Sequence, residues 1–371
     1  MSVEARWVAF RNGLLANPAF HRFAARFPLF KPIAQAEAYR LFDLTAGFVY
    51  SQVLGAAVEL GLLEILAEGP KPAENLGPQL GLAEAPLRAF LRATAGLELT
   101  ECLRDGRIAL GSQGAALLGD PGLKRMISHH RKFYRDLDDT VALLRRGGGG
   151  GEVQSYWAYA RVTDPSGAKS AEVADYSQLM AETAISFADD VLDVWPLTPY
   201  RKLMDVGGGE GAFLSVVARR APSLKLVLFD LPAVVERAEA RLAASGLRDR
   251  VERVGGSFSA EALPTGADLI SLIRIVHDHD DPVVLALFRA IYAALPKGGE
   301  ILIAEPMAGI AGAGRPTEVY FSLYLLAMGH GRTRSASEIG DMLKAAGFRR
   351  IRVRKTASLL PFGVMVAARD N

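Results

Sequence analysis

The sequence contains a single cysteine, Cys102, among its 371 residues. No disulfide can form within the chain, and a reducing compartment such as the cytoplasm suits it. The net charge is only +2, so the chain has no large excess of basic residues that would favour binding to nucleic acid. No apolar run approaches the ~20 residues of a membrane-spanning helix, and the first residues lack the apolar core of a signal peptide. We therefore expect a cytoplasmic protein, long enough for two domains.

Residues 1–118 predict an N-terminal arm followed by a mostly helical domain. The expected helices span 41–67, 73–80 and 83–97, and the expected hairpin spans 99–110 around an Asp-Gly turn. Helices followed by a β-ribbon are typical of a winged helix, which often binds DNA, so a regulator is one alternative. Against it, the helix that would read DNA carries Glu84 beside Arg88 and Arg92 and has no basic cluster.

The arm, residues 6–31, is basic and aromatic. Phenylalanines and Trp7 alternate with Arg11, Arg22 and Arg26. Such a segment can lie on a membrane surface or pack on a partner subunit, but we favour an amphipathic arm that covers the core of its own chain. Further on, five consecutive glycines at 147–151 predict a flexible surface loop.

Residues 202–212 organise the second domain, which we expect to span 119–371. A short apolar strand containing Asp205 is followed by a glycine turn with Gly207, Gly209 and Gly211, and then by a helix. This is the first half of a βαβ unit, where adenine cofactors bind. Asp205 and Glu210 would repel a pyrophosphate but suit the ammonium and sulfonium of S-adenosylmethionine. An ordinary glycine-rich turn is the alternative.

Asp230 ends the next predicted strand, 224–230, and lies 230 − 211 = 19 residues past Gly211. A carboxylate at this place, ~20 residues on, accepts hydrogen bonds from both ribose hydroxyls of an adenosine cofactor. The alternative is a surface aspartate that caps the helix after Pro232. From here strands and helices alternate to the end of the chain, with two closing strands at 349–355 and 364–367. We therefore expect a seven-stranded α/β sheet with an antiparallel end, a Rossmann-like layout that resembles that of the class I methyltransferases.

His277 follows a predicted strand, 267–276, and Glu305 ends a neighbouring one, so both lie at the sheet edge where the cofactor is expected. Methylation of a hydroxyl requires removal of its proton, and a neutral imidazole is a suitable base near pH 7. Glu305 would orient His277 and stabilise its imidazolium. A structural histidine and a structural acid are the plain alternatives. A metal site on His277, His279 and the neighbouring aspartates is disfavoured because adjacent residues on a turn seldom converge.

The motifs D-V-G-G-G-E-G at 205–211, F-D-L-P at 229–232, G-G-S-F at 255–258, H-D-H-D-D at 277–281, A-E-P-M at 304–307 and A-A-G-F at 345–348 occur in the order found in the plant-type small-molecule O-methyltransferases. The chain resembles that family from about residue 41 onwards. The resemblance implies a homodimer that uses S-adenosylmethionine. From the ligand spacing and the net charge we expect no metal and no nucleic acid. It implies His277 as the base with Glu305 beside it, and Asp230 on the ribose. The remaining cofactor contacts that we expect are Asp205, Gly207, Gly209, Leu231, Gly256, Ser257, Phe258 and Arg274.

The chain departs from the family pattern at two places. Ser257 stands where the family usually has an aspartate, which weakens the expected contact with the adenine amino group. The sequence Gly331-Arg332-Thr333-Arg334 lacks the second acid that often precedes Arg-Thr. A base held by one carboxylate suggests an acceptor unlike the plant phenols.

Within the family, the segments 11–18, 24–28, 46–53 and 324–329 resemble the branch that methylates carotenoids in purple bacteria. That likeness implies an acyclic carotenoid with a tertiary hydroxyl as the acceptor. It adds a peripheral position at the inner, photosynthetic membrane to the candidate locations. We expect Met180, Tyr324 and Met328 to contact the acceptor. Another hydrophobic acceptor, such as a phenol or a bacteriochlorophyll intermediate, is the alternative.

Overall fold

The computed structural model describes residues 1–156, 188–310, 316–356 and 362–370. The chain forms two compact units, residues 1–118 and 119–371. Each unit has its own apolar core.

The first unit consists of helices and one β-ribbon, as the sequence predicts. Its helices are α1 (Val3–Leu15), α2 (Pro18–Arg26), α3 (Lys31–Glu59), α4 (Leu62–Ala67), α5 (Ala73–Leu80), α6 (Glu84–Gly96) and α7 (Ser112–Leu118). The strands β1 (Thr100–Cys102) and β2 (Ile108–Leu110) pair antiparallel. Leucines from α4, α5 and α6 form the core with Ile108 of the ribbon, because these helices place their apolar residues on one face.

The prediction that the arm covers the core of its own chain is wrong. No residue of α1 is buried, and Ala24 is the only buried residue of α2. Asn17 caps α2 by accepting a hydrogen bond from the Ala19 amide at 2.8 Å, so the arm is helical without a core beneath it. By length and composition α3 is apolar enough to cross a membrane, which the sequence analysis did not expect.

Ahead of its sheet, the second unit contains α8 (Pro121–Leu137), α9 (Thr140–Arg145) and α10 (Glu152–Tyr156). The glycines at 147–151 do not form the flexible loop that their composition predicts. The Gly149 amide donates to the Leu326 carbonyl at 2.9 Å, and a Cβ on Gly148 would lie 2.4 Å from that oxygen. Glycine is required here because the loop backbone packs directly on the helix that carries Leu326.

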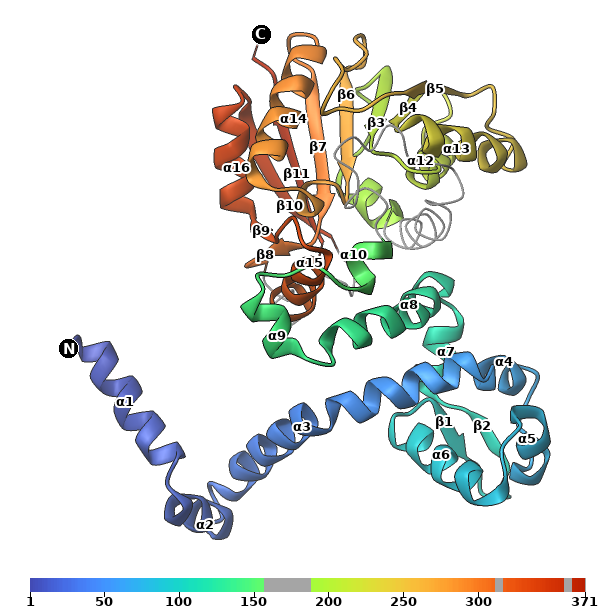
Figure 1. Cartoon of the computed structure of the whole chain (residues 1–371), viewed down its shortest axis with the longest axis vertical. Helices are drawn as coiled ribbons and strands as arrows, with labels where there is room; N and C mark the ends of the chain where they lie inside the picture. Colours follow the sequence, from blue (N-terminus) through green and yellow to red (C-terminus); the bar gives the residue numbers. More distant parts are fainter. Residues whose placement is uncertain (157–187, 311–315, 357–361, 371) are drawn as a thin grey trace. The chain divides into compact units, whose positions relative to one another are not determined.

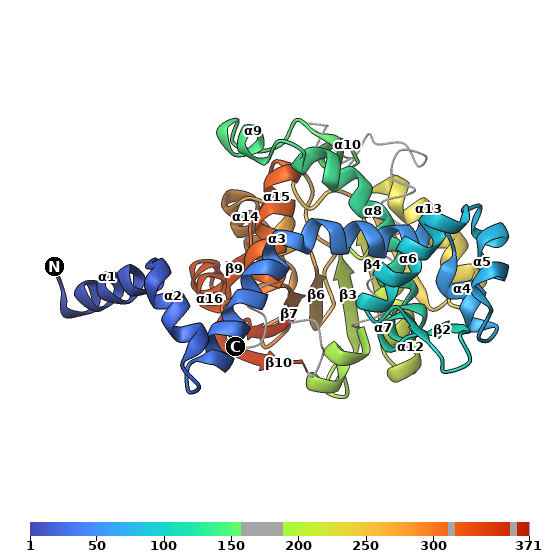
Figure 2. The ribbon, with the colours of Figure 1, turned by 90° about the horizontal axis from the view of Figure 1, so that it is seen from below.

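A seven-stranded sheet forms the second unit, in the order β10-β11-β7-β6-β3-β4-β5 (Figure 1). The strands are β3 (Lys202–Val206), β4 (Lys225–Asp230), β5 (Val251–Gly255), β6 (Leu269–Ile273), β7 (Glu300–Glu305), β10 (Arg349–Lys355) and β11 (Gly363–Ala368). The first five run parallel, and β11 is antiparallel to both neighbours. The expected sheet with an antiparallel end is thus confirmed, and Figure 2 shows β7, β6, β3 and β4 side by side.

Helices cover both faces of this sheet. On one face α12 (Ala212–Arg220) and α13 (Pro232–Ala244) pack with residues 188–197, and on the other α14 (Asp281–Ala294) and α16 (Ala336–Ala345) pack (Figure 1). The strands are apolar on both sides because both sides are buried. Near the carboxyl end of β7, β8 (Met307–Ala308) pairs with β9 (Arg334–Ser335), and the π-helical turn η4 (Pro316–Phe321) leads into α15 (Ser322–Met328).

The strand predicted at 267–276 is shorter than its apolar sequence suggests. β6 ends at Ile273, Arg274 has a φ of 59°, and the 3₁₀ turn η3 (Val276–Asp278) follows. A positive φ is unfavourable for arginine and ends the extended backbone. His277 therefore lies on a turn at the carboxyl edge of the sheet and not on the strand itself.

Candidate active site

The glycine turn after β3 lies against the end of β4. The Gly207 amide donates to the Phe229 carbonyl at 2.8 Å, and the Gly209 amide donates to Asp230 Oδ2 at 2.7 Å. A Cβ added to Gly209 would meet no atom within 4 Å. The turn thus leaves open space beside its backbone at Gly209, which a ligand needs for close approach.

Asp205 is buried beneath this turn, with 1% of its surface exposed. Its Oδ1 accepts a hydrogen bond from Ser271 Oγ at 2.6 Å, and its Oδ2 has no hydrogen-bond partner among the described residues. Burial raises the pKa of Asp205 to about 7, with a smaller upward contribution from Asp230. A cation or a hydrogen-bond donor at the turn would stabilise this carboxylate.

Asp230 ends β4 beside the glycine turn. Its carboxylate accepts hydrogen bonds from the amides of Gly209 and Leu231, both at 2.7 Å. Burial raises the pKa of Asp230 to about 6 despite these two donors. Its backbone carbonyl accepts from Gly256 at 2.9 Å, so Asp230, Leu231 and Gly256 meet at one place on the sheet edge.

Ser257 and Phe258 follow β5 and extend this edge. Ser257 is buried, and Phe258 is half-buried with its ring edge-on to His279 at a centroid distance of 5.3 Å. Phe258 thus contacts the turn that carries His277, although the two segments come from different strands.

His277 lies between two carboxylates. Its backbone amide donates to Glu305 Oε2 at 3.0 Å, its Nδ1 lies 3.3 Å from the same oxygen, and its Nε2 lies 3.1 Å from Asp278 Oδ1. Glu305 is fully buried, and its Oε1 has no hydrogen-bond partner among the described residues. The structure therefore brings His277 and Glu305 together, and it adds Asp278, which our sequence analysis did not single out. The expectation of a base held by one carboxylate is wrong, because the second acid comes from the residue next to the histidine and not from the segment before Arg332.

Burial lowers the pKa of His277, but the carboxylates of Asp278 and Glu305 outweigh burial and raise it above the usual value of histidine. For Asp278, burial raises the pKa of the carboxyl, and the positive charge of protonated His277 opposes this rise. An imidazole in this setting binds a proton more tightly than histidine in water does. The arrangement suits a group that accepts a proton from a weak acid.

Arg274, whose backbone φ of 59° is unfavourable for a residue with a side chain, comes just before the turn that carries His277. The pKa of Asp278 and that of Tyr320 are raised by burial, and that of His277 is raised by its carboxylate neighbours; the positive charge of Arg274 opposes each of these rises. Strained residues of this kind cluster at functional sites. Arg274 was predicted beside the cofactor, and the structure puts its charge close to the histidine and its carboxylate partner.

Histidines and aromatic rings continue from His277 into the helices of the second unit. The Phe321 ring lies edge-on to His277 at 6.0 Å. His129 Nε2 is 2.8 Å from the Tyr324 hydroxyl, and His130 Nε2 is 2.9 Å from the Tyr320 hydroxyl. Burial lowers the pKa of both histidines to about 4, so both are neutral at pH 7. The resulting group of packed side chains, which we call the aromatic cluster, consists of His129, His130, Phe133, Tyr320, Phe321 and Tyr324.

Of the three residues expected to contact the acceptor, Tyr324 belongs to this cluster. Met328 is fully enclosed by apolar side chains that include Leu143 and Val153. Met180 lies outside the described residues. Sequence reasoning missed His129 and His130, and the adjacent pair of histidines on an amphipathic helix was the signal that could have indicated them.

Glu210 does not take the role that its place in the glycine turn suggests. Its Oε1 accepts from Arg237 at 2.7 Å, and its Oε2 lies 3.7 Å from Arg241. These arginines of α13 neutralise the carboxylate, so Asp205 is the acid of the turn that remains for a ligand. Among the described residues, no group of three or more His, Cys, Asp or Glu side chains is placed to hold a metal ion.

Comparison with protein families identifies two segments. Residues 135–349 match the O-methyltransferase domain, and residues 42–117 match the O-methyltransferase dimerisation domain. The second match runs from within α3 to α7 and includes the ribbon but not α1 and α2, and the first includes β3 to β9 of the sheet unit.

Curated relatives and solved structures agree with these matches. The chain is 44% identical to demethylspheroidene O-methyltransferase of Cereibacter sphaeroides, over 92% of this chain and 89% of that protein. It is 42% identical to the protein of that name from Rhodobacter capsulatus, over 97% and 89% of the two chains. Human N-acetylserotonin methyltransferase, solved in complex with SAM, superposes with a TM-score of 0.75 at 26% identity, over 90% of this chain and 98% of that one.

Proposed function

The chain belongs to the S-adenosylmethionine-dependent O-methyltransferase family, and within it we propose that the enzyme methylates the tertiary hydroxyl of an acyclic hydroxycarotenoid. The proposed acceptor is of the hydroxyneurosporene or demethylspheroidene type. The observation that carries the proposal is His277 between two buried carboxylates in a chain 44% identical to a demethylspheroidene O-methyltransferase. Because the chain belongs to an enzyme family, we no longer consider the alternative that it is a winged-helix regulator of DNA.

The residues at the glycine turn fit the cofactor. S-adenosylmethionine, when bound, supplies an activated methyl group. Asp205 offers an unpaired, buried carboxylate oxygen towards a cationic group, and Asp230 offers a carboxylate to the ribose hydroxyls. Gly209 leaves the backbone accessible, Gly207 begins the same turn, Leu231 and Gly256 continue the same edge, and Ser257 and Phe258 flank the adenine. Arg274 adds a positive charge between this edge and His277.

His277 acts as the general base. A tertiary alkyl hydroxyl is far less acidic than a phenol, so its proton must leave as the oxygen attacks, and a positioned base is required. Glu305 holds the imidazole through Nδ1 and through the backbone amide. Asp278 and Glu305 stabilise the imidazolium that forms, and the raised pKa of His277 reflects that effect.

The aromatic cluster binds the polyene next to the base. Its rings are contributed by α8, η4 and α15, and Phe321 reaches His277. Flat aromatic side chains suit a long, flat, apolar chain because they bury area with few conformational losses. Tyr324 is the member that we expect to govern acceptor affinity, and Met180 and Met328 remain predictions.

The enzyme works as a homodimer through residues 42–117, the segment that matches the dimerisation domain. α3 supplies much of this surface, since Phe42, Leu44 and Phe48 are each at least 63% exposed within one chain. An exposed apolar helix of that kind is buried in stable dimers. We infer that the exposed apolar side chains of α3 contact the partner subunit and that α3 does not span a membrane.

The arm ahead of α3 makes a peripheral contact with the membrane in which a carotenoid dissolves. Five cationic residues and no acidic ones occur between residues 5 and 36. On α2 and its C-terminal side, the exposed rings of Phe23, Phe27 and Phe30 lie within 6.4 Å of one another. Aromatic residues beside cations are typical of helices that lie in the interface of anionic lipids.

A flotation assay tests the membrane contact. We expect the enzyme to float with vesicles that contain phosphatidylglycerol and to detach at 0.5 M salt, and we expect F23S/F27S/F30S to stay in the soluble fraction. Val141→Ser is the control, because it removes an equally exposed apolar side chain from α9. Equal flotation of the triple variant and the wild type would contradict the contact.

The acceptor is tested with labelled S-adenosylmethionine and three acceptors: an acyclic hydroxycarotenoid, a simple phenol and a bacteriochlorophyll intermediate. We expect label in the carotenoid ether and a kcat/KM at least a hundredfold above the other two. Transfer to the phenol or the bacteriochlorophyll intermediate in preference to the carotenoid would refute the proposed acceptor and leave the family assignment intact.

A further inference from the structure

Arg334 is a charged residue with none of its surface exposed. It belongs to β9, and its register partner in β8 is Met307, two residues after Glu305. Burial of a guanidinium is costly unless each of its donors finds an acceptor. The acceptors that Arg334 finds belong to the turn that carries His277.

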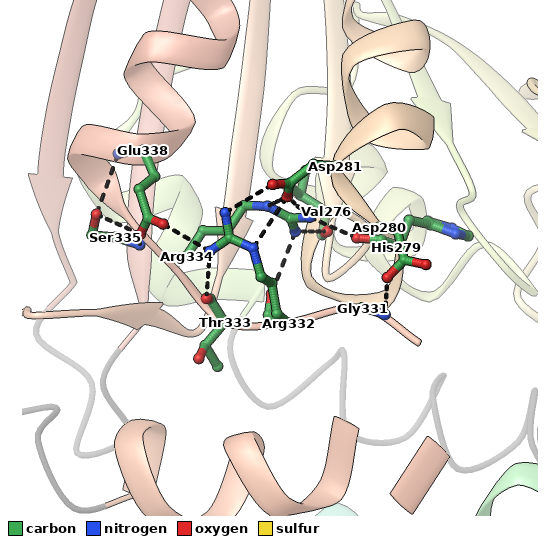
Figure 3. A network of polar contacts seen from close by, with 10 residues as sticks. All are labelled: Val276, His279, Asp280, Asp281, Gly331, Arg332, Thr333, Arg334, Ser335 and Glu338. Carbon is green, nitrogen blue, oxygen red and sulfur yellow. Dashed lines mark hydrogen bonds and ion pairs between the residues drawn. The ribbon is translucent and has the colours of Figure 1, made fainter. Parts of the chain in front are cut away.

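The guanidinium spans that turn (Figure 3). Nη1 donates to the Val276 carbonyl at 2.7 Å and Nη2 to the His279 carbonyl at 2.8 Å, while Nε donates to Asp281 Oδ1 at 2.9 Å. The two carbonyls lie on either side of His277 and Asp278 in the sequence. One rigid group therefore fixes both ends of the segment that presents the base, and a planar fork does this where a lysine ammonium cannot.

Two residues shortly before Arg334 also form hydrogen bonds to the segment 276–281. His330 Nδ1 is 2.7 Å from the Asp278 carbonyl, and the Gly331 amide donates to Asp280 Oδ1 at 2.9 Å. Gly331 has a φ of 76°, and a Cβ there would lie 2.3 Å from the His277 carbonyl oxygen. Glycine is needed because the segment passes directly over the backbone of the histidine.

We propose that Arg334 is a positioning residue for methyl transfer, which holds residues 276–281 so that the imidazole of His277 meets the acceptor hydroxyl. This inference rests on the proposed role of His277 as the base. The imidazole is also fixed by Glu305 and Asp278 and lies in the field of Arg274. Those contacts orient the ring, whereas Arg334 sets the place of the backbone that carries it.

Arg332 offers a matched control in the same network. Its guanidinium pairs with Asp281 at 3.1 Å, as that of Arg334 does, and with Glu338 at 2.7 Å. It is about half exposed, and neither its Nε nor its Nη atoms bond a carbonyl of residues 276–281 in the interactions described. R332K therefore preserves the backbone contacts of the turn while it alters the ion pair with Asp281.

The test compares R334K with R332K in the purified full-length enzyme. A displacement of the base by ~1 Å costs about a hundredfold in rate. We expect R334K to lower kcat by about that factor per S-adenosylhomocysteine-binding site, with little change in the KM for S-adenosylmethionine. R332K should stay within threefold of wild type. A role in fold stability alone would lower the number of binding sites and leave kcat per site unchanged.

A double-mutant cycle separates this inference from the base assignment. If Arg334 acts through His277, R334K should cause no further loss of kcat in the H277A background. An equal loss in both backgrounds, or a wild-type kcat per site in R334K, would overturn the proposal. A wild-type rate in H277A would instead refute the base itself.

If R334K does not bind S-adenosylhomocysteine, its kcat per binding site cannot be measured. Gly331→Ala then provides a second test of the same turn. The new Cβ pushes on the His277 carbonyl without removing any charge. We expect the same fall in kcat per site and the same non-additivity with H277A. An additive effect, or no effect on kcat, would again overturn the proposal.

Discussion

Replacement of His277 by alanine tests the centre of the proposed mechanism. The imidazole is 4% exposed and contacts Glu305 at 3.3 Å and Asp278 at 3.1 Å. No other described side chain that can act as a neutral base at pH 7 lies against both carboxylates. The variant therefore removes the proton acceptor and leaves the cofactor-side residues Asp205 and Asp230 untouched.

The expected loss follows from the usual contribution of general base catalysis, ~10²–10⁴-fold. At 1.36 kcal/mol for each factor of ten, this corresponds to about 2.7–5.4 kcal/mol of transition-state stabilisation. Glu305→Gln should lose less, because the amide oxygen can still accept from the His277 backbone amide. Asp278→Asn should also lose less, since it removes a stabilising charge and not the base.

The assay is single-turnover methyl transfer with both substrates saturating, alongside calorimetry with S-adenosylhomocysteine. We expect the affinity for S-adenosylhomocysteine in H277A to stay within threefold of wild type. In the wild type, the rate should rise as the pH increases through the pKa of His277, above the usual histidine value, because only the neutral imidazole accepts a proton. That rising limb should be absent in H277A.

His279→Ala is the matched control on the same turn. Burial lowers the pKa of His279 to about 4, and its ring packs on Phe258 away from the two carboxylates. We expect a loss below tenfold. Turnover of H277A at the wild-type rate, or loss of activity in H279A alone, would refute the assignment of the base.

Three further expectations concern the cofactor edge and the assembly. Asp230→Ala should weaken S-adenosylhomocysteine at least tenfold by calorimetry, because each hydrogen bond to a charged group contributes about 1.5–3 kcal/mol, and unchanged affinity in a folded variant would contradict the ribose contact. Asp205→Asn should gain thermal stability over the wild type as the pH rises from about 4 to about 7, since the carboxyl of Asp205 ionises in the unfolded wild type across that range while its raised pKa keeps it protonated in the fold, which destabilises the wild type but not the amide; a difference in Tm that is the same at every pH would refute this. Light scattering at micromolar concentration should give the mass of a dimer, and a monomeric mass would count against an interface through residues 42–117.

Local patterns in the sequence were enough to predict the sheet, the glycine turn and the residues at strand ends. The apolar run 202–206, the glycines after it and Asp230 at the end of the next strand follow from short-range periodicity and turn chemistry. Parallel strands put their carboxyl ends at one edge, so the proximity of His277 and Glu305 was also predictable. The family motifs extended that inference to the cofactor.

Contacts between distant segments were decided by the tertiary structure. The pairing of Glu210 with Arg237, the packing of the Gly147–Gly151 loop on α15 and the bond between His129 and Tyr324 all join residues that no local pattern relates. The same holds for Arg334, which the sequence presents as one arginine among several and the fold buries across the carbonyls of the His277 turn. Periodicity reports which face of an element is apolar, but the partner of a buried charge depends on which elements pack together. For that physical reason the candidate base and the candidate cofactor edge could be predicted from the sequence, whereas the groups that contact them could be found only from the fold.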